Sequence, residues 1–302
     1  MMPGAGGEPG YRSGFVSLVG RPNVGKSTLL NRILDRKVSI VSDKPQTTRS
    51  EIRGVYTREG LQAVFLDTPG VHKPRTKLGE RLNRRAIGTL GEVDVICQLV
   101  EANAALGPGD RHVAATIAAV EGPRILVLNK VDLATPAEIA ERLAGAADAL
   151  GEFDAYVPVC ARSGEGVGVL LEEIVARLPE GPQYYPDGMV TDQPEAFVAA
   201  EIVREKLLAV VRDELPHSIA VVVDDIEERD NGVLAIPAVV LVERESQKGI
   251  VIGKGGEVLK RVGTRAREEL ELLLGTKVFL EIRVKVEPDW QRRDHALDRL
   301  GF

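Results

Sequence analysis

Short apolar runs alternate with longer amphipathic stretches in the first part of the chain. The apolar runs have the length and the turn-rich borders of buried strands, and they cover residues 15–20, 93–100, 124–129 and 156–161. The stretches between them have helical composition and period, and they cover residues 77–91, 110–120, 136–150 and 166–178, with one more helix beginning at Lys26. Strands that alternate with helices predict an α/β fold with a mostly parallel sheet covered on both faces.

One edge of this sheet is expected to be antiparallel. The segments SEIRGVYT and LQAVFLD have the pattern of two strands, and Arg58-Glu59-Gly60 between them is typical of a hairpin turn. A hairpin at this point adds one strand that runs against the others.

The second part of the chain has a different pattern. Residues 179–194 contain four Pro and two Gly, which is typical of a linker between domains. Asn231-Gly232, further on, is a strong hairpin signal between two apolar runs. The elements follow the order αββααβ, an α+β pattern, with a helix over 194–214, strands over 217–228 and 233–244, a short helical piece, a helix over 256–274 and a strand over 277–286.

These patterns predict two domains. We expect a disordered tail at 1–12, a first domain at 13–180, a linker at 181–194, and a second domain with a C-terminal tail at 195–302.

Composition narrows the classes of protein. The net charge of the 302 residues is −6, so the chain as a whole lacks the basic surface that bulk nucleic-acid binding needs. Its two cysteines, Cys97 and Cys160, lie in apolar runs, which favours buried free thiols, and they offer no ligand pairs at zinc spacing with the four scattered His. Few cysteines fit a reducing cytosol, and no apolar run approaches the roughly 18 residues of a membrane span. We therefore expect a cytoplasmic protein.

Residues 20–27, GRPNVGKS, match the phosphate-binding pattern G-x-x-x-x-G-K-[ST] between a strand and a helix. Gly20 and Gly25 let the backbone curl so that N–H groups point at phosphate oxygens, and the helix N-terminus adds its dipole. Lys26 is expected to reach the β- and γ-phosphates, and the Ser27 hydroxyl to ligate Mg²⁺. The predicted phosphate site contains Gly20, Arg21, Pro22, Asn23, Val24, Gly25, Lys26, Ser27 and Thr28.

The segment NKVD is predicted to recognise the base of the bound nucleotide. It follows the strand RILVL, at the carboxyl end of the sheet where ligands bind in open α/β folds. The Asp132 carboxylate can accept two N–H bonds from guanine, whereas adenine offers no such pair of donors. Ala161 of the later segment CAR can give a backbone N–H to guanine O6. The predicted base site contains Asn129, Lys130, Val131, Asp132, Cys160, Ala161 and Arg162.

The segment DTPG, residues Asp67, Thr68, Pro69 and Gly70, ends the strand AVFLD. Asp67 is placed to hold Mg²⁺ through water, and the Gly70 N–H can meet the γ-phosphate. The polar loop KPQTTRS offers Thr48 as the second protein ligand of Mg²⁺, with Thr47 as the alternative. The predicted metal ligands are therefore Ser27, Thr48 and Asp67, and Lys26, Thr48 and Gly70 are the predicted catalytic residues.

Together these motifs resemble the Ras-like, translation-factor-related GTPases. Within them, GRPNVGKST, QTTR and DTPG resemble the Era and Der group of bacterial GTPases. The resemblance implies binding of GTP and GDP and hydrolysis of GTP. Members of the group usually carry Ser-Ala where this chain has Cys160-Ala161, a change that keeps the backbone contact with the base.

The residue after DTPG predicts slow hydrolysis. Ras-like enzymes have a glutamine there that orients the attacking water, whereas this chain has Val71, which forms no side-chain hydrogen bond. Some relatives with Asn at the position of Asn23 use it to hold K⁺, and the resemblance implies the same here as a hypothesis. The alternative is that Asn23 only braces the loop.

A glycine-rich loop, VIGKGG at 251–256, joins two helical pieces of the αββααβ pattern, which resembles a type II KH domain. Such a loop lets a nucleic-acid backbone approach closely while a groove holds about four bases. Residues 246–267 carry six basic side chains and one acidic, the local charge that an RNA site requires. The alternative is a solvated basic helix face. The predicted RNA-binding residues are Ile252, Gly253, Lys254, Gly255, Gly256 and Lys260.

A GTPase domain followed by a type II KH domain resembles the Era family over nearly the whole chain. The resemblance implies a monomeric, GTP-dependent assembly factor for the small ribosomal subunit that binds the 3′ end of small-subunit rRNA. It also implies peripheral association with the inner face of the cell membrane. Two other functions stay open at this point, a GTPase whose second domain docks a protein partner and a membrane-associated signalling GTPase without RNA.

Overall fold

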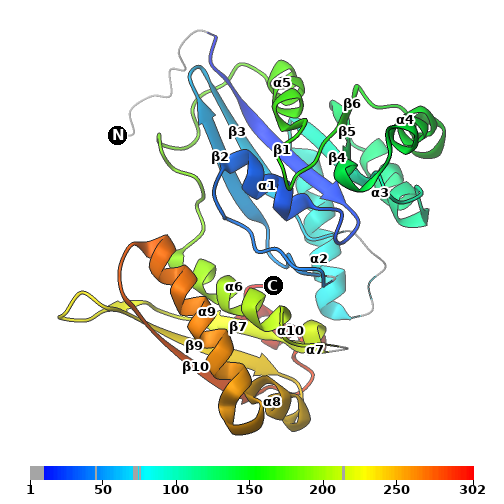
Figure 1. The fold of residues 1–302 in the computed structure, drawn as a ribbon. Coiled ribbons are helices and arrows are strands. Elements are labelled where there is room, and N and C mark those ends of the chain that lie inside the picture. Colours follow the sequence, from blue (N-terminus) through cyan, green and yellow to red (C-terminus); the bar gives the residue numbers. More distant parts are fainter. Residues whose placement is uncertain (1–9, 45, 71–73, 75, 213–214) are drawn as a thin grey trace. The chain divides into compact units, whose positions relative to one another are not determined.

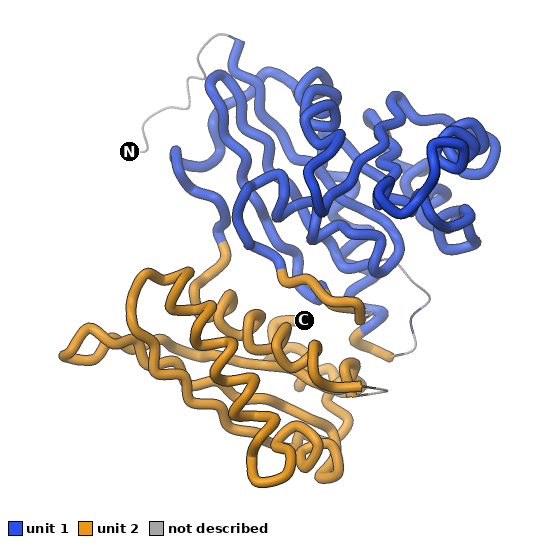
Figure 2. The backbone as a smooth tube through the Cα atoms, in the orientation of Figure 1, with its two compact units in different colours: residues 1–39, 48–74, 79–192 blue, residues 40–47, 75–78, 193–302 orange. Residues whose placement is uncertain are grey.

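The computed structural model describes residues 10–44, 46–70, 74, 76–212 and 215–302. They form two compact units, which Figure 2 distinguishes by colour. Unit 1 contains residues 1–39, 48–74 and 79–192, and unit 2 contains residues 40–47, 75–78 and 193–302.

Unit 1 is built on a six-stranded sheet with the order β2-β3-β1-β4-β5-β6 (Figure 1). β2 runs antiparallel to β3, and the other neighbours are parallel. The strands are β1 (Arg12–Gly20), β2 (Ile52–Arg58), β3 (Leu61–Asp67), β4 (Val95–Glu101), β5 (Arg124–Asn129) and β6 (Ala155–Pro158). The mostly parallel α/β sheet and the hairpin at Arg58-Glu59-Gly60 are therefore confirmed.

Helices alternate with these strands, and α1 crosses in front of the sheet in Figure 1. They are α1 (Lys26–Leu34), α2 (Lys77–Gly88), α3 (Pro108–Ala118), α4 (Pro136–Leu150) and α5 (Val167–Arg177), with short 3₁₀ turns at Thr89–Glu92 and Val131–Leu133. Val19 and Ile96 of the sheet pack with Ala86 of α2 and with Val113 and Ile117 of α3.

The proline-rich segment before residue 193 is held against unit 1 by specific bonds. Gln62 Oε1 accepts the N–H groups of Tyr184 and Tyr185 at 2.8 and 2.9 Å. The Val55 N–H donates to Val190 O at 2.8 Å. The composition of this segment is that of a linker, yet its middle part is anchored to the hairpin strands.

The main elements of unit 2 follow the αββααβ order expected for a KH domain, with the short α7 and β8 in addition, and β9 lies between β10 and β7 in its sheet. β10 is parallel to β9, and β7 and the short β8 are antiparallel to it. The elements are α6 (Glu195–Leu208), α7 (Leu215–Ser218), β7 (Ala220–Val223), β8 (Glu227–Glu228), β9 (Leu234–Val242), α8 (Glu245–Ile252), a 3₁₀ turn (Lys254–Gly256), α9 (Glu257–Leu274) and β10 (Val278–Val286).

Two element boundaries in unit 2 differ from the sequence expectation. The helix predicted over 194–214 ends at Leu208, where Val210 and Val211 follow. These β-branched residues favour helix weakly, and Val211 packs into the core outside any helix. The strand predicted over 217–228 begins three residues later and is interrupted at Asp224-Asp225, because Asp is disfavoured in strands.

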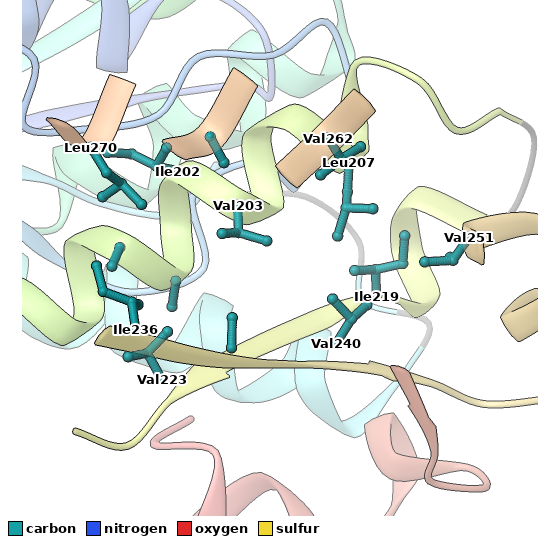
Figure 3. Close-up of a cluster of buried hydrophobic side chains, with 14 of the residues drawn as sticks. Ile202, Val203, Leu207, Ile219, Val223, Ile236, Val240, Val251, Val262 and Leu270 are labelled. Carbon is teal, nitrogen blue, oxygen red and sulfur yellow. The ribbon is translucent and has the colours of Figure 1, made fainter. Parts of the chain in front are cut away.

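The core of unit 2 lies between its helices and one face of its sheet (Figure 3). Ile202, Val203 and Leu207 of α6 are at most 3% exposed and pack with Val262 and Leu270 of α9. Because neighbouring residues of a strand point to opposite faces, β9 contributes its even-numbered positions, Ile236, Ala238, Val240 and Val242.

The residues after β10 form regular structure. A 3₁₀ turn (Trp290–Arg292) and helix α10 (Asp294–Arg299) follow β10. Trp290 is fully buried, donates its indole N–H to Ser218 O at 3.0 Å and stacks on Phe302. Arg293 and Arg299 donate to Glu287 and hold the pKa of that carboxyl below its usual value.

Cys97 and Cys160 are both buried and free, as expected. Burial raises the pKa of the Cys97 thiol to about 12. Among the described residues, none of the helices has the length and apolar character needed to cross a membrane.

Candidate functional site

The phosphate-binding loop lies between β1 and α1, in the position that the motif requires. Gly25 precedes the first residue of α1 with φ 101°, a conformation that L side chains rarely adopt. A Cβ at Gly25 would overlap the side-chain amide of Asn129. Glycine therefore lets the phosphate loop and the base-reading segment NKVD touch.

Lys26 is buried at the centre of this loop. Its Nζ donates to the carbonyl oxygens of Gly20 and Arg21, both at 3.3 Å. Burial lowers the pKa of Lys26, and the nearby charge of Asp67 opposes that shift. The ammonium is thus held by backbone carbonyls where the motif places the β- and γ-phosphates.

Three predicted metal ligands come together at the end of β3. Ser27 Oγ donates to Asp67 Oδ2 at 2.7 Å, and Thr48 Oγ1 lies 3.0 Å from Ser27 Oγ. Thr47 turns its hydroxyl elsewhere, donating to Lys44 O at 2.6 Å. Of the two threonines, the geometry therefore favours Thr48 as the ligand.

These residues fit a magnesium ion. Asp67 is fully buried, and among the described residues its Oδ1 has no hydrogen-bond partner. Burial raises the pKa of the Asp67 carboxyl, while the Lys26 charge and hydroxyl bonds lower it. Hydroxyl and carboxylate oxygens are what Mg²⁺ prefers, and a divalent cation would meet the unsatisfied oxygen and keep the carboxyl ionised.

Ser39 is a member of this site that the motifs did not predict. Its Oγ donates to Asp67 Oδ2 at 2.9 Å, and the residue is 2% exposed. The sequence offers one signal, a serine between apolar Val38 and Ile40 shortly before Thr48, the predicted magnesium ligand. That signal alone does not separate Ser39 from a solvent-facing strand serine.

The base-reading residues also lie together. Asn129 joins two loops, since its Nδ2 donates to Val24 O at 2.8 Å and its Oδ1 accepts the Ala161 N–H at 3.0 Å. Lys130 donates to Asn23 O at 2.9 Å and pairs with Glu101 at the end of β4. The contact of Ala161 with guanine O6 stays a prediction, because its N–H must then be shared with Asn129.

Cys160 takes part in this arrangement through its side chain. Its thiol donates to Asp132 Oδ1 at 3.1 Å, so the cysteine occupies the place of the usual serine as a weaker donor. Asp132 itself is exposed, and it is therefore available to a base.

The remaining predicted nucleotide residues surround these groups. Arg21 Nε donates to Asp110 Oδ1 at 2.7 Å, which ties the phosphate loop to the start of α3. Thr68 Oγ1 donates to Leu18 O at 3.2 Å. A Cβ at Gly70 would lie 2.9 Å from Pro22 N, so DTPG and the phosphate loop are packed together. Val71 lies outside the described residues.

Unit 2 presents the glycine-rich loop between α8 and α9. Gly253 and Gly255 have φ 76° and 61°. A Cβ at Gly253 would overlap the Val258 side chain, whereas one at Gly255 would meet nothing within 4 Å. Lys254 and Gly255 are exposed. The loop is thus packed against Val258 at Gly253 and has free space beside Gly255.

The charges around this loop are on the surface. Lys260 and Arg265 of α9 are exposed, whereas Val262 and Ala266 of the same helix are buried. Ile250 of α8 is 57% exposed, although it is apolar. Basic side chains and an exposed apolar residue beside an open glycine loop are the features that an interface for single-stranded RNA needs.

Comparison with known families matches both units. Residues 15–130 match the family described as 50S ribosome-binding GTPase, and residues 214–291 match the KH domain family.

Comparison with whole proteins gives long matches. The GTPase Era of Carboxydothermus hydrogenoformans is 50% identical over 293 residues, which cover 97% of this chain and 98% of that protein. The GTPase Era of Mycolicibacterium smegmatis is 50% identical over 297 residues, 97% of this chain and 99% of that protein.

Two solved structures are similar over most of the chain. One is Era in complex with MgGDPNP and nucleotides 1506–1542 of 16S ribosomal RNA, with a TM-score of 0.93, 41% identity, and coverage of 96% of this chain and 98% of the other. The second is a variant of Aquifex aeolicus Era bound to GDP and AlF4⁻, with a TM-score of 0.93, 40% identity, and coverage of 96% and 99%.

Proposed function

The chain belongs to the Era family of GTPases, and from that premise we propose that it binds the 3′ end of small-subunit 16S rRNA in a GTP-dependent way and assists maturation of the small ribosomal subunit. GTP hydrolysis in unit 1 is the activity of the family. The proposal concerns the RNA that unit 2 binds and the process that GTP binding and hydrolysis control.

The open glycine-rich loop of unit 2 carries the RNA part of this proposal. Gly255 leaves room for a phosphate backbone on its outer side, and Lys254 offers a charge at the same point. The exposed Ile250 and the basic face of α9 lie on the two helices that the loop joins. The relative bound to nucleotides 1506–1542 of 16S rRNA supports the choice of RNA.

The residues of unit 1 support the GTP-hydrolysis part of the proposal. Ser27 and Thr48 would ligate Mg²⁺ directly and Asp67 through water. When bound, the ion neutralises charge on the β- and γ-phosphates. Lys26 would exchange its backbone carbonyl partners for phosphate oxygens, and the Gly70 N–H would meet the γ-phosphate.

An RNA crosslinking experiment tests the proposed partner. RNA crosslinked to the full chain in cells and then sequenced should be enriched in fragments from the 3′ end of small-subunit rRNA. In a binding titration with such a fragment, the logarithm of the affinity should fall with the logarithm of salt concentration by about 0.7 for each phosphate neutralised. Affinity that ignores salt would favour a protein partner for unit 2 instead.

Potassium is the second proposed ion, and Asn23 is its proposed ligand. Asn23 has φ 67° and its carbonyl accepts the Lys130 ammonium, so its backbone is fixed in the left-handed region. A monovalent cation against the phosphates would stabilise charge in the transition state as an arginine finger does.

GTP turnover of the parent chain should be faster in potassium than in sodium at equal ionic strength, and Asn23→Gly should abolish the difference. Glycine keeps the left-handed backbone, whereas Asn23→Ala adds strain of roughly 1–2 kcal/mol. Equal parental rates in the two salts would contradict potassium binding. A potassium preference that survives in Asn23→Gly would leave the ion without Asn23 as ligand.

The place of the protein in the cell follows from the same family. We expect a monomer in the cytoplasm that associates peripherally with the inner face of the cell membrane.

A further inference from the structure

Ser39 occupies a place at the Asp67 carboxylate that the established nucleotide motifs do not explain. Its hydroxyl donates to Asp67 Oδ2 at 2.9 Å, the same oxygen that accepts from Ser27 at 2.7 Å. Thr48 is farther from this oxygen, at 3.5 Å. Ser39 is therefore the second hydroxyl, after Ser27 of the phosphate loop, within 3.0 Å of this carboxylate oxygen.

A turn centred on the partly buried Asn31 fixes the position of Ser39. Asn31 of α1 accepts the N–H groups of Val38 and Ser39 at 2.9 and 3.0 Å and donates to Ser39 O at 2.7 Å. Both backbone groups of Ser39 are thus bound by one side chain. Only the side-chain torsion of Ser39 remains free, and its bond to Asp67 uses that freedom.

The Ser39 hydroxyl differs in its role from the hydroxyls of Ser27 and Thr48. Ser27 and Thr48 are the predicted metal ligands, so their oxygens are committed to the ion. Ser39 holds one carboxylate oxygen, Oδ2, whereas among the described residues the other oxygen, Oδ1, has no hydrogen-bond partner. The bond from Ser39 holds Oδ2 and leaves Oδ1 available to a metal ion.

We propose that Ser39, clamped by Asn31, is a positioning residue that orients Asp67 for magnesium and so sets the affinity of the nucleotide site for the ion. Partners of this kind around metal ligands, when removed, typically weaken metal binding by about 10- to 100-fold. The inference rests on the magnesium site that the proposed function uses.

The test measures how magnesium slows the release of radiolabelled GDP from the full chain. In the parent, the release rate should fall as Mg²⁺ is added, with a half-maximal concentration that reports ion affinity. In Ser39→Ala this concentration should rise by about 10- to 100-fold. In excess EDTA, the variant and the parent should release GDP at the same rate, because no ion is then present for Asp67 to serve.

Two outcomes overturn the proposal. One is an unchanged magnesium dependence in Ser39→Ala. The other is faster GDP release in EDTA as well, which would assign Ser39 to the nucleotide pocket or to folding rather than to the ion. If the parent itself shows no magnesium dependence, the proposed magnesium site fails before Ser39 is tested, so the two failures are distinguishable.

Further variants keep the test sharp where Ser39→Ala folds poorly. Ser39→Cys keeps a weaker donor of similar shape and should give an intermediate magnesium affinity. Asn31→Ala should also lower the affinity for magnesium. The double variant should bind magnesium no more weakly than the single variant with the lower affinity, because both substitutions act through one bond. Additive effects would contradict the clamp.

Ser42→Ala is the matched control. Ser42 lies three residues further on, and its hydroxyl accepts the Lys44 N–H at 3.1 Å instead of contacting Asp67. Its loss should leave the magnesium dependence unchanged, and a shift equal to that of Ser39→Ala would show that the segment in general, not Ser39, matters.

Discussion

Replacing Asp132 by asparagine should lower GTP affinity more than tenfold and move the preference of the site toward xanthine nucleotides. The carboxylate would accept two N–H bonds from guanine, and hydrogen bonds to a charged group are worth about 1.5–3 kcal/mol each. Asparagine has the same shape, and its oxygen can still accept the Cys160 thiol. Its NH2 group supplies N–H donors in place of a carboxylate oxygen, and a donor suits the carbonyl of xanthine. Competition of GTP and XTP against labelled GDP measures both effects.

An exposed charge elsewhere in unit 1 provides the control for this prediction. Asp148 is exposed on α4 of the same unit, and Asp148→Asn makes the same change of charge away from the base. It should bind GTP as the parent does. If Asp132→Asn also binds GTP as the parent does, Asp132 does not read the base.

Lys254→Asp should lower affinity for RNA by roughly 10- to 150-fold, the range that corresponds to one charge-assisted bond of 1.5–3 kcal/mol. It replaces a phosphate contact with repulsion at the open side of the glycine-rich loop. Gly255→Asp is the better companion variant, because a Cβ there meets nothing within 4 Å, and Asp tolerates left-handed backbone. Gly253→Asp would instead collide with Val258 and disturb the fold. Binding of a 3′-end rRNA fragment to the full chain measures the effect.

A lysine-to-aspartate change on the face of the unit 2 sheet that points away from α8 and α9 is the control. Lys285 of β10 is paired with Leu241 and lies on the face turned away from the core that packs against the helices. Lys285→Asp should leave RNA affinity nearly unchanged. GTP hydrolysis by all three variants without RNA should match the parent. Loss of hydrolysis in Lys254→Asp would indicate misfolding, and undiminished RNA affinity would place the RNA site elsewhere.

Elements with local signals were predicted well from the sequence. Helix α4 begins and ends as expected, because Pro136 suits its first position and Thr135 and Glu138 exchange hydrogen bonds at its start. The places of GRPNVGKS and NKVD in the fold were predicted for a similar reason, since each segment is contiguous and its order along the chain fixes its place on a parallel sheet.

Features that depend on distant residues were missed. Ser39 acquires its role only because Asn31 clamps its backbone and Asp67, far along the chain, receives its hydroxyl. Trp290 lies beyond the last predicted strand, and it contacts Ser218 and Phe302. Pattern and propensity report a residue's neighbours in the sequence, whereas these contacts arise from packing.

The buried Trp290 gives the protein a built-in optical probe. It is the one tryptophan of the 302 residues, so indole fluorescence arises from unit 2 alone and the whole nucleotide-binding unit is dark at that wavelength. A nucleotide stabilises the unit that it binds according to its concentration relative to its dissociation constant. An indole unfolding transition that moves with GTP concentration would therefore reveal that the two units unfold together, and a stationary one that they unfold separately.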